Sequence, residues 1–522
     1  MDAALLPRLL FALLLLSGPA AWAQAEPKPE SESVSESESE PESETDWEPP
    51  LVDPHQPWLR PRPPAKEKHY FRTAIEEALA LAGGTAWYWI DRERQVADWD
   101  FPSLSERLTL DVIRYDNNPH EVNFAFHAAN GMSFHFLARV NGLSFLESVA
   151  AGALTSLTWE YLLEYREKVS FNDLMFTTGS GIPLGEFVHV IGRYLNEDPD
   201  AAGRLTPVAR WTAGFPAALT GVMDGTPLAS LATKPDFYHD LHLAYSFSSA
   251  ETEVDTEEDD HRLQGLYFDG RFVTMPGYLK PGVWGRFFHT AEFTESEMEL
   301  VFGGKGSATR VFAETTLLGW HSQQIHEDPS FLSNAITVGV PMAYRYRREE
   351  AGIWDQRVGV LHFPGLGADL HLQWRDFSFD AGARAHVDFA GINALSNDVW
   401  EAAHPDELGK SILRKQGYYY GFGGSVALSA KLRYRSLILG GEVWAGRYES
   451  DEGLDRIQEE LTVDQQASDT LRHENLWLRV EELPYNLYLG AKISREKRTA
   501  HLEEFDASGA LTSLTMHLGF AL

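Results

Sequence analysis

Alternation of apolar and polar residues over long segments is the feature that most constrains the fold of this chain. In one such segment, Phe377, Phe379 and Val387 alternate with Asp380 and Arg384. Strands in soluble sheets usually have about five or six residues, whereas a tilted strand that crosses a bilayer needs about 9–11 residues. Long strands with one apolar and one polar face predict a transmembrane β-barrel, apolar toward lipid and polar toward the lumen.

We predict an antiparallel outer-membrane barrel of about twelve strands in residues 231–522. The strands are expected near 237–249, 261–274, 283–298, 308–321, 333–346, 366–376, 377–390, 417–434, 435–448, 472–483, 485–498 and 510–522. Long connections are expected at 250–260, 347–365, 391–416, 449–471 and 499–509. Because such barrels have long outer loops and short periplasmic turns, we expect these connections to face the outside.

Charged residues on the inward strand faces leave two interpretations open. On one predicted strand, Asp380, Arg384, His386 and Asp388 share the polar face. Opposite charges in this arrangement are typical of a small barrel whose interior is filled by ion-paired side chains. The same residues would also suit a polar pore or a lipid-modifying site.

The N-terminal region carries export and tether signals. Residues 1–23 resemble a signal peptide that ends in a small-residue cleavage site, Ala21-Trp22-Ala23. Residues 24–66 are rich in Ser, Glu and Pro, and because such a segment buries little apolar surface we expect a disordered acidic tether. The chain has no Cys, which excludes disulfides and thiolate metal sites. Its formal net charge of −33 disfavours nucleic acid as a partner, because phosphate binding needs a basic face.

Residues 67–230 are predicted to form a helical domain, because their apolar residues recur every three or four positions. Helices are expected at 71–90, 131–140, 145–168, 183–196 and 206–223. The helix at 145–168 carries a stripe at every fourth residue, formed by Ser148, Gly152, Ser156, Glu160 and Glu164. This stripe is small at one end and doubly acidic at the other, which a plain core helix does not require.

The same domain contains a set of spaced polar, glycine and aromatic residues. They are Asn123, His127, Gly131, Arg139, Asn141, Gly142, Ser156, Trp159, Glu160, Tyr161, Glu164, Asp173, Leu174, Gly181, Gly185 and Glu186. This pattern resembles an uncharacterised bacterial envelope family known as domain of unknown function 3943, over about residues 110–225. The family has no assigned activity, so the resemblance implies an envelope location and little chemistry.

The acidic end of the stripe is the candidate site. Glu160 and Glu164 lie one helical turn apart, and Asp173 follows after a short loop. With His127 or His189 they could form an oxygen-rich site for a divalent cation. They could also supply a general acid and a general base if burial separates their pKa values. No other cofactor is predicted.

A structural role is the alternative for these carboxylates, in which they cap backbone amides and pair with Arg139 or Arg166. Under either role we expect Trp159, Glu160 and Glu164 to form a buried site. The segments expected to cover it are 123–127, 172–173 and 179–185.

The expected fold is α+β, an N-terminal helical periplasmic domain followed by the barrel. Three functions remain open. The first is an outer-membrane barrel whose helical domain acts as a plug or docking module in transport or envelope assembly. The second is a hydrolase that acts on lipid or glycan through Glu160, Glu164, Asp173 and His127, and the third is a structural anchor of the envelope. The expected partners are outer-membrane lipid and an envelope protein bound by the helical domain or the acidic tether.

Overall fold

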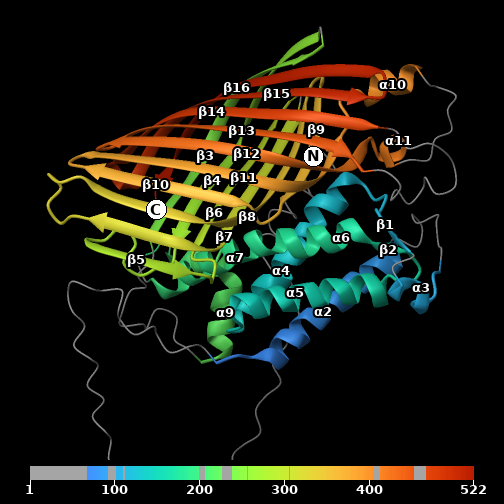
Figure 1. The fold of residues 1–522 in the computed structure, drawn as a ribbon, viewed down its shortest axis with the longest axis horizontal. Coiled ribbons are helices and arrows are strands. Elements are labelled where there is room, and N and C mark those ends of the chain that lie inside the picture. Colours follow the sequence, from blue (N-terminus) through green and yellow to red (C-terminus); the bar gives the residue numbers. More distant parts are fainter. Residues whose placement is uncertain are drawn as a thin grey trace, which may run out of the picture.

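The chain forms two parts, a helical domain within residues 67–225 and a β-barrel within residues 238–521 (Figure 1). The computed structural model describes residues 67–91, 101–109, 112–198, 201, 206–225, 238–255, 257–304, 306–403, 412–451 and 466–521. The predicted signal peptide and acidic tether lie outside these described residues.

Long antiparallel strands form the barrel. They are β3 (Tyr238–Val254), β4 (Glu257–Val273), β5 (Gly282–Phe288), β6 (Phe293–Gly303), β7 (Gly306–Ile325), β8 (Ser333–Ala351), β9 (Trp354–His362), β10 (Leu366–Trp374), β11 (Phe377–Asn393), β12 (Tyr418–Tyr434), β13 (Leu437–Ser450), β14 (Ala467–Leu483), β15 (Leu487–Leu502) and β16 (Phe505–Ala521). Pairing of β16 with β3 and of β7 with β8 closes the sheet on itself. β5 and β6 share one place beside β7, and β9 and β10 share one place between β8 and β11. The fourteen strands therefore fill twelve positions, which confirms the predicted barrel.

Several predicted connections are strand in the structure. They are 250–260, 347–365 and 499–509, whose hairpins turn tightly at residues with positive φ: Asp255, Gly352 and Glu503. The charged residues in these segments suggest loops, but the strands continue past the apolar band as polar hairpins. The predicted strand 283–298 is interrupted, because residues 289–292 separate β5 from β6.

Alternate residues of the strands face the outside and the lumen, as the sequence predicts. On β12, Val426 and Leu428 point outward and are exposed. Lys431 on the same strand points inward, where its Nζ lies 3.2 Å from Asp240 Oδ2 on β3 and 3.8 Å from Asp380 Oδ2 on β11. The outward face is therefore apolar and the lumen is lined with ion pairs.

The two ends of the barrel differ. β3 begins and β16 ends at one end, the proximal end. At the other, distal end, the connection 394–417 carries two short helices, α10 (Asn397–Ala403) and α11 (Ile412–Gln416). Trp400 of α10 and Leu413 of α11 are buried in one apolar cluster with the lumen-facing Val358 and Tyr448. This cluster lies in the lumen at its distal end.

Short helices and single π-helical turns make up the helical domain. Its elements are α2 (Tyr70–Asp91), α3 (Leu104–Leu108), β1 (Ile113–Arg114), η3 (Val122–Phe126), α4 (His127–Val140), α5 (Phe145–Thr158), η4 (Trp159–Leu163), β2 (Val169–Ser170), α6 (Phe171–Met175), η5 (Phe176–Ser180), α7 (Gly181–Glu197), α8 (Thr206–Trp211) and α9 (Phe215–Met223). η3, η4 and η5 are the π turns. Among the helices that the structure describes, none is both long and apolar enough to cross a membrane.

Helix boundaries in this domain follow local sequence signals. Ser144 begins α5 with a capping box, in which its hydroxyl accepts a hydrogen bond from Glu147 N and the Glu147 carboxylate accepts one from Ser144 N. The predicted helix 145–168 is shorter than expected, because the π turn η4 ends it at Leu163. The predicted helix 206–223 is divided into α8 and α9 around Gly214.

The helical domain packs on the outer wall of the barrel, beside it rather than at one of its ends (Figure 1). Phe124 of η3 is fully buried against the outward-facing Tyr418 and Tyr420 of β12. Phe187 of α7 packs on Phe272 of β4. Three cavities lie in the lumen, and none of the described residues that line them comes from the helical domain. The described helices of the helical domain therefore lie outside the lumen.

Candidate functional site

Close glycine contacts between α4 and α7 set the frame of the candidate site. A Cβ on Gly131 of α4 would lie 1.6 Å from the carbonyl oxygen of Thr177 in η5. A Cβ on Gly181 would lie 2.5 Å from backbone of Gly131, and one on Gly185 would lie 2.9 Å from the carbonyl oxygen of Met132. Small residues let helix backbones approach in this way. The segment 179–185 is therefore a helix junction packed on α4, and not the loop expected over Glu160.

The structure brings the three predicted carboxylates together. Glu160, Glu164 and Asp173 each place one carboxylate oxygen within 4.8 Å of the others. His127, at the start of α4, places its Nε2 3.4 Å from Asp173 Oδ1. We call Glu160, Glu164, Asp173 and His127 the acidic cluster.

Each part of the acidic cluster lies next to a π turn. His127 directly follows η3, Glu160 lies within η4, and α6, which carries Asp173, runs directly into η5. In η4, Glu164 N donates to the carbonyl oxygen of Trp159, five residues back. Such turns shift the side chains that follow them and are frequent at functional sites. The first four residues of the predicted stripe are buried as expected, and the π turn positions Glu164 beside them.

Burial and mutual repulsion dominate the electrostatics of the acidic cluster. Glu160 and Asp173 are each only 2% exposed. Burial raises the pKa of Glu160 well above its ordinary value, and the Glu164 carboxylate raises it further. Burial also raises the pKa of Asp173, with Asp116 as the largest charged contributor. A cluster of this kind can retain protons at neutral pH or bind a divalent cation through its carboxylate oxygens.

Glu160→Gln is expected to flatten the pH dependence of helical-domain stability. The folded-state pKa values of Glu160 and Asp173 lie above their ordinary values of 4.5 and 3.8. Above about pH 4 the folded state therefore binds more protons than the unfolded state, and the free energy of unfolding falls as pH rises. The measurement is hydrogen-exchange protection of α5 from about pH 5 to about pH 8, in chelator-containing buffer and corrected for intrinsic exchange.

The exposed Glu67→Gln change is the matched control and should leave the pH profile as in the wild type. A Glu160→Gln profile identical to that of the wild type would contradict the prediction. If Mg²⁺ or Ca²⁺ restores protection at high pH in the wild type but not in Glu160→Gln, the acidic cluster binds a cation.

Arg139, one of the cations expected to balance these carboxylates, lies in a second buried group. Its Nε and Nη2 donate to Glu186 Oε2 and Oε1, both at 2.9 Å. His135 Nε2 donates to Glu186 Oε2 at 3.1 Å. Burial raises the pKa of Glu186, but the charge of Arg139 and the bond from His135 outweigh it and hold this pKa below its usual range. His189 also faces Glu186, so this predicted ligand does not join the acidic cluster.

Arg107 of α3 is the cation beside the acidic cluster that the sequence did not reveal. Its Nη1 donates to the carbonyl oxygen of Glu160 at 2.9 Å, and its Nη2 donates to that of Glu164 at 2.9 Å and to that of Glu167. Arg107 therefore fixes the backbone at the end of η4, and these hydrogen bonds go to carbonyl oxygens and not to the carboxylates. It is 53 residues from Glu160 and belongs to a five-residue helix, so no periodic pattern marked it.

Other residues of the sequence motif have structural positions around the site. Gly142 adopts φ 84° directly after α4, as expected where a glycine ends a helix. Asn141 Nδ2 donates to Glu76 Oε2 at 2.6 Å. Asn123 Nδ2 donates to the hydroxyls of Tyr418 and Tyr420 at 2.9 and 2.7 Å, which ties the motif to the barrel wall.

Trp159 has a different environment from the one predicted. Its ring packs edge-on against Tyr88 of α2, with ring centroids 6.1 Å apart, and a Cβ on Gly84 would lie 2.9 Å from it. It therefore joins α2 to η4. Three segments were expected to cover the site. Segment 172–173 and the His127 end of 123–127 lie at the acidic cluster. Segment 179–185 packs on α4 instead.

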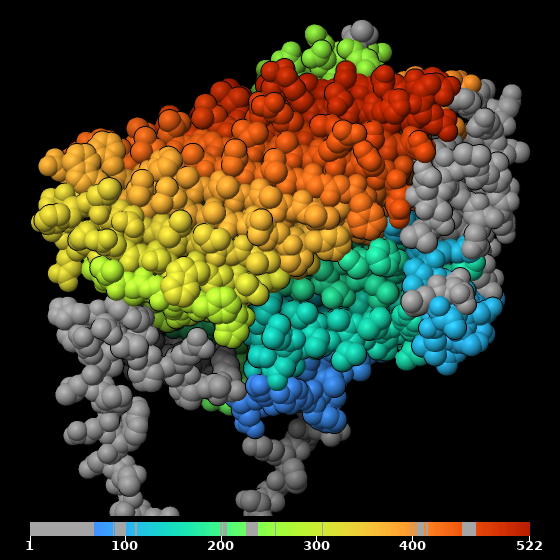
Figure 2. All heavy atoms as spheres, viewed as in Figure 1, coloured from blue at the N-terminus to red at the C-terminus, as the bar shows by residue number. Residues whose placement is uncertain are grey.

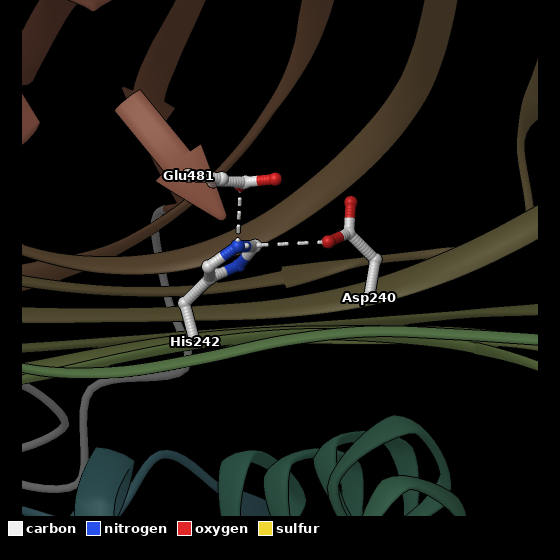
Figure 3. Close-up of side chains that lie close together, drawn as sticks. All are labelled: Asp240, His242 and Glu481. Carbon is white, nitrogen blue, oxygen red and sulfur yellow. Dashed lines mark hydrogen bonds and ion pairs between the residues drawn. The ribbon is translucent and has the colours of Figure 1, made fainter. Parts of the chain in front are cut away.

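A second carboxylate–histidine group lies inside the barrel near its proximal end (Figure 3). His242 Nε2 donates to Glu481 Oε1 at 2.8 Å and lies 3.7 Å from Asp240 Oδ1. Two arginines balance this group: Arg433 and Arg479 lie 2.8 and 3.5 Å from the Glu481 carboxylate. The group is therefore part of the ion-paired lining of the lumen.

An even number of strand positions, an apolar outer face and a charged lumen define the class: a transmembrane β-barrel that carries a helical domain on its wall. Residues 112–214 match the family described as a domain of unknown function (DUF3943), which confirms the resemblance. The matched segment contains the acidic cluster and the buried group formed by Arg139, His135 and Glu186. No curated protein matches the chain.

Three of the solved structures that are similar to this chain come from Pseudomonas species. A Pseudomonas aeruginosa FadL homologue is 8% identical over 56% of this chain and 91% of its own, with a TM-score of 0.22. The P. putida toluene transporter TodX is 9% identical over 54% and 90%, with a TM-score of 0.22. Pseudomonas aeruginosa OpdQ is 8% identical over 54% and 98%, with a TM-score of 0.18. At these scores the likeness carries no information about what the present chain binds or moves.

Proposed function

We propose that this chain is an outer-membrane protein whose barrel conducts small polar solutes or ions when its distal end opens. The observation that carries this proposal is a charged cavity of about 220 Å³ inside the barrel. Two further cavities, of about 40 and about 120 Å³, adjoin it, and Phe312 and Glu442 line all three. The three cavities are therefore neighbours within the lumen.

The lining of the largest of these three cavities favours cations. Its seven carboxylates are Asp240, Asp269, Glu295, Glu297, Asp369, Asp380 and Glu442. Its four basic residues are Arg271, Lys431, Arg479 and Lys492. A surplus of carboxylates around a pore attracts cations and repels anions.

The orientation that supports this proposal places the proximal end in the periplasm. The long connections at 394–417 and 451–466 both leave the distal end. Barrels of this class carry their longer loops on the outside and short turns toward the periplasm. The N-terminal region then enters the barrel from the periplasmic side, as the sequence predicts, and outer-membrane lipid is the partner this placement requires.

Opening the distal end is expected to raise conductance. The wild type should conduct poorly in a planar bilayer, because the cluster around Trp400 and Leu413 lies in the lumen there. Replacing residues 395–416 with a short Gly-Ser linker should raise the single-channel conductance several-fold. The reversal potential in a KCl gradient should show cation selectivity. Lys431→Glu should increase that selectivity, because it replaces a basic residue of the lining with a carboxylate.

Trp400→Ala should give a smaller rise in conductance, and Trp374→Ala is its matched control, because Trp374 is exposed on the outer wall. Heat-modifiable migration in gels establishes that each variant has a folded barrel. A folded linker variant that conducts no better than the wild type would overturn the proposal and favour the structural anchor.

The geometry does not favour the hydrolase interpretation. Glu160 and Asp173 are buried, and Arg107 and Ser170 N hold the backbone and carboxylate of Glu160 in place. None of the three lumen cavities reaches the acidic cluster. Among the described residues, Glu160 and Asp173 are therefore not lined up along any of these three cavities, as a hydrolase centre open to substrate would be.

A further inference from the structure

The outermost helix of the helical domain, α2, exposes apolar residues and buries polar ones. On α2, Phe71, Ile75 and Leu79 are exposed, together with the neighbouring Ala74, Ala78 and Ala82. The opposite face of α2, which is turned toward the domain interior, carries the buried Thr73 and Glu77. A helix on the surface of a soluble protein shows the reverse pattern, with its apolar stripe facing the core.

α5 has the same distribution of residues. Its exposed face carries Leu146, Leu154 and Leu157, with Leu162 continuing it on η4. Its buried face is the stripe of small and polar residues that includes Ser148 and Ser156. Thr155 Oγ1 donates to Glu77 Oε2 at 2.8 Å, so the polar faces of α5 and α2 meet inside the domain. The contact between α5 and α2 is therefore polar, and the outer side of both helices is apolar.

Charged residues lie at the two ends of this apolar face. Lys68 and Glu147 form an ion pair of 2.9 Å at one end, and Arg166 and Lys168 follow η4 at the other. Together α5 (14 residues) and η4 (5 residues) are about 28 Å long at about 1.5 Å per residue. The hydrocarbon core of a bilayer is about 30 Å thick, so the length of α5 and η4 matches its depth.

The helical domain also lies along the outer wall of the barrel. Phe124 contacts β12 toward the distal end, and Phe187 contacts β4 toward the proximal end. The domain therefore extends along most of the wall. In Figure 2 the surface of the helical domain, blue to teal, directly adjoins the wall of the barrel, yellow to red.

We infer that the exposed apolar face of α2, α5 and η4 lies in the hydrocarbon of the membrane, where it contacts lipid acyl chains and continues the lipid-facing belt of the barrel. This inference rests on the proposed membrane location of the barrel. Lipid explains why the apolar residues face outward and the polar residues inward, because apolar side chains gain nothing by leaving hydrocarbon. Polar groups inside such a domain must bond with one another, as Thr155 and Glu77 do.

Site-directed spin labelling tests this inference directly, because the full-length chain has no native Cys. Single cysteines replace Leu79 and Leu154 on the helical domain, Leu428 on the outward face of β12, and the exposed Asp506. Each nitroxide-labelled protein is reconstituted into phosphatidylcholine vesicles. Power saturation then compares its collision rates with oxygen, which concentrates in hydrocarbon, and with a water-soluble nickel chelate.

Labels at positions 79 and 154 are expected to collide more with oxygen than with the nickel chelate, as the label at 428 should. The label at 506 should show the opposite preference. Labels at 79 and 154 that prefer the chelate while 428 prefers oxygen would overturn the inference and place this face in water. Low collision rates with both reagents would also overturn it, because the face would then be covered by protein. A label at 428 that prefers the chelate would instead contradict the membrane location of the barrel.

Discussion

Replacing Gly131 with alanine is expected to unfold the helical domain and leave the barrel closed. The added Cβ would lie 1.6 Å from the carbonyl oxygen of Thr177, where the obstacle is backbone and cannot rotate away. Overpacking a tight interior usually costs about 1–3 kcal/mol and sometimes more, and we expect at least the upper end of that range. Trypsin sensitivity of α4 and α7 in the detergent-solubilised protein measures the loss, and heat-modifiable migration reports on the barrel.

Gly83→Ala is the matched control on α2, because nothing lies within 4 Å of the Cβ it would add. Alanine is the better helix former by about 1 kcal/mol, so this change should leave the domain unharmed or slightly more stable. Equal trypsin resistance of the two variants would contradict the close contact between α4 and η5.

Arg139→Leu is expected to destabilise the helical domain by about 3–5 kcal/mol at neutral pH, because it leaves the buried Glu186 carboxylate without its charged partner. The pH dependence has a defined sign. In the wild type the pKa of Glu186 is depressed, so the stability it contributes is present above its ordinary value of 4.5 and is lost as pH falls below it. Without Arg139, burial raises this pKa and Glu186 takes up a proton on acidification. The deficit of the variant relative to the wild type should therefore shrink from pH 7 toward pH 5.

Urea-induced loss of hydrogen-exchange protection in α4 and α7 measures both effects. The control is Arg193→Leu on α7, which removes a more exposed pair with Glu197 one turn along the helix. Such pairs contribute about 0.5 kcal/mol. Adding Glu186→Leu to Arg139→Leu should recover part of the loss, since no unpaired charge then remains. A deficit that is the same at every pH would show that packing, and not the ion pair, is what Arg139 provides.

The barrel was predictable from sequence because period-two alternation over ten or more residues is typical of few structures besides a membrane-spanning strand. Connections were harder, since a charged hairpin such as the one around Asp255 looks like a loop whether or not its strands continue. The position of the helical domain on the outer wall of the barrel was not predictable at all. Phe389 lies on the same face of β11 as the exposed Val387, and Tyr418 and Tyr420 lie on the same face of β12 as the exposed Val426. Apolar residues that face lipid and those that face helices therefore give one pattern.

In the helical domain, the i, i+4 spacing correctly grouped Glu160 with Glu164 and placed the stripe in the interior. The loop to Asp173 was short enough for that residue to be included. Partners from distant segments gave no such signal: Arg107 and Tyr420 reach the site only through tertiary structure, and Arg139 pairs with Glu186 instead. The π turns were also invisible in the pattern, because a single inserted residue changes the direction of one side chain without changing the composition.

The seating of Phe124 on the barrel wall has a consequence for the order of folding. Its neighbour Asn123 bonds to Tyr418, 295 residues later in the chain, and the glycines that make room for the Phe124 ring lie on β9 and β11. Contacts of such long range form late, because the intervening chain must first be organised. The part of the protein that is synthesised first therefore completes its packing last, after β9, β11 and β12 are in register. Until then its buried carboxylates and its apolar exterior have to be shielded by something other than the native fold.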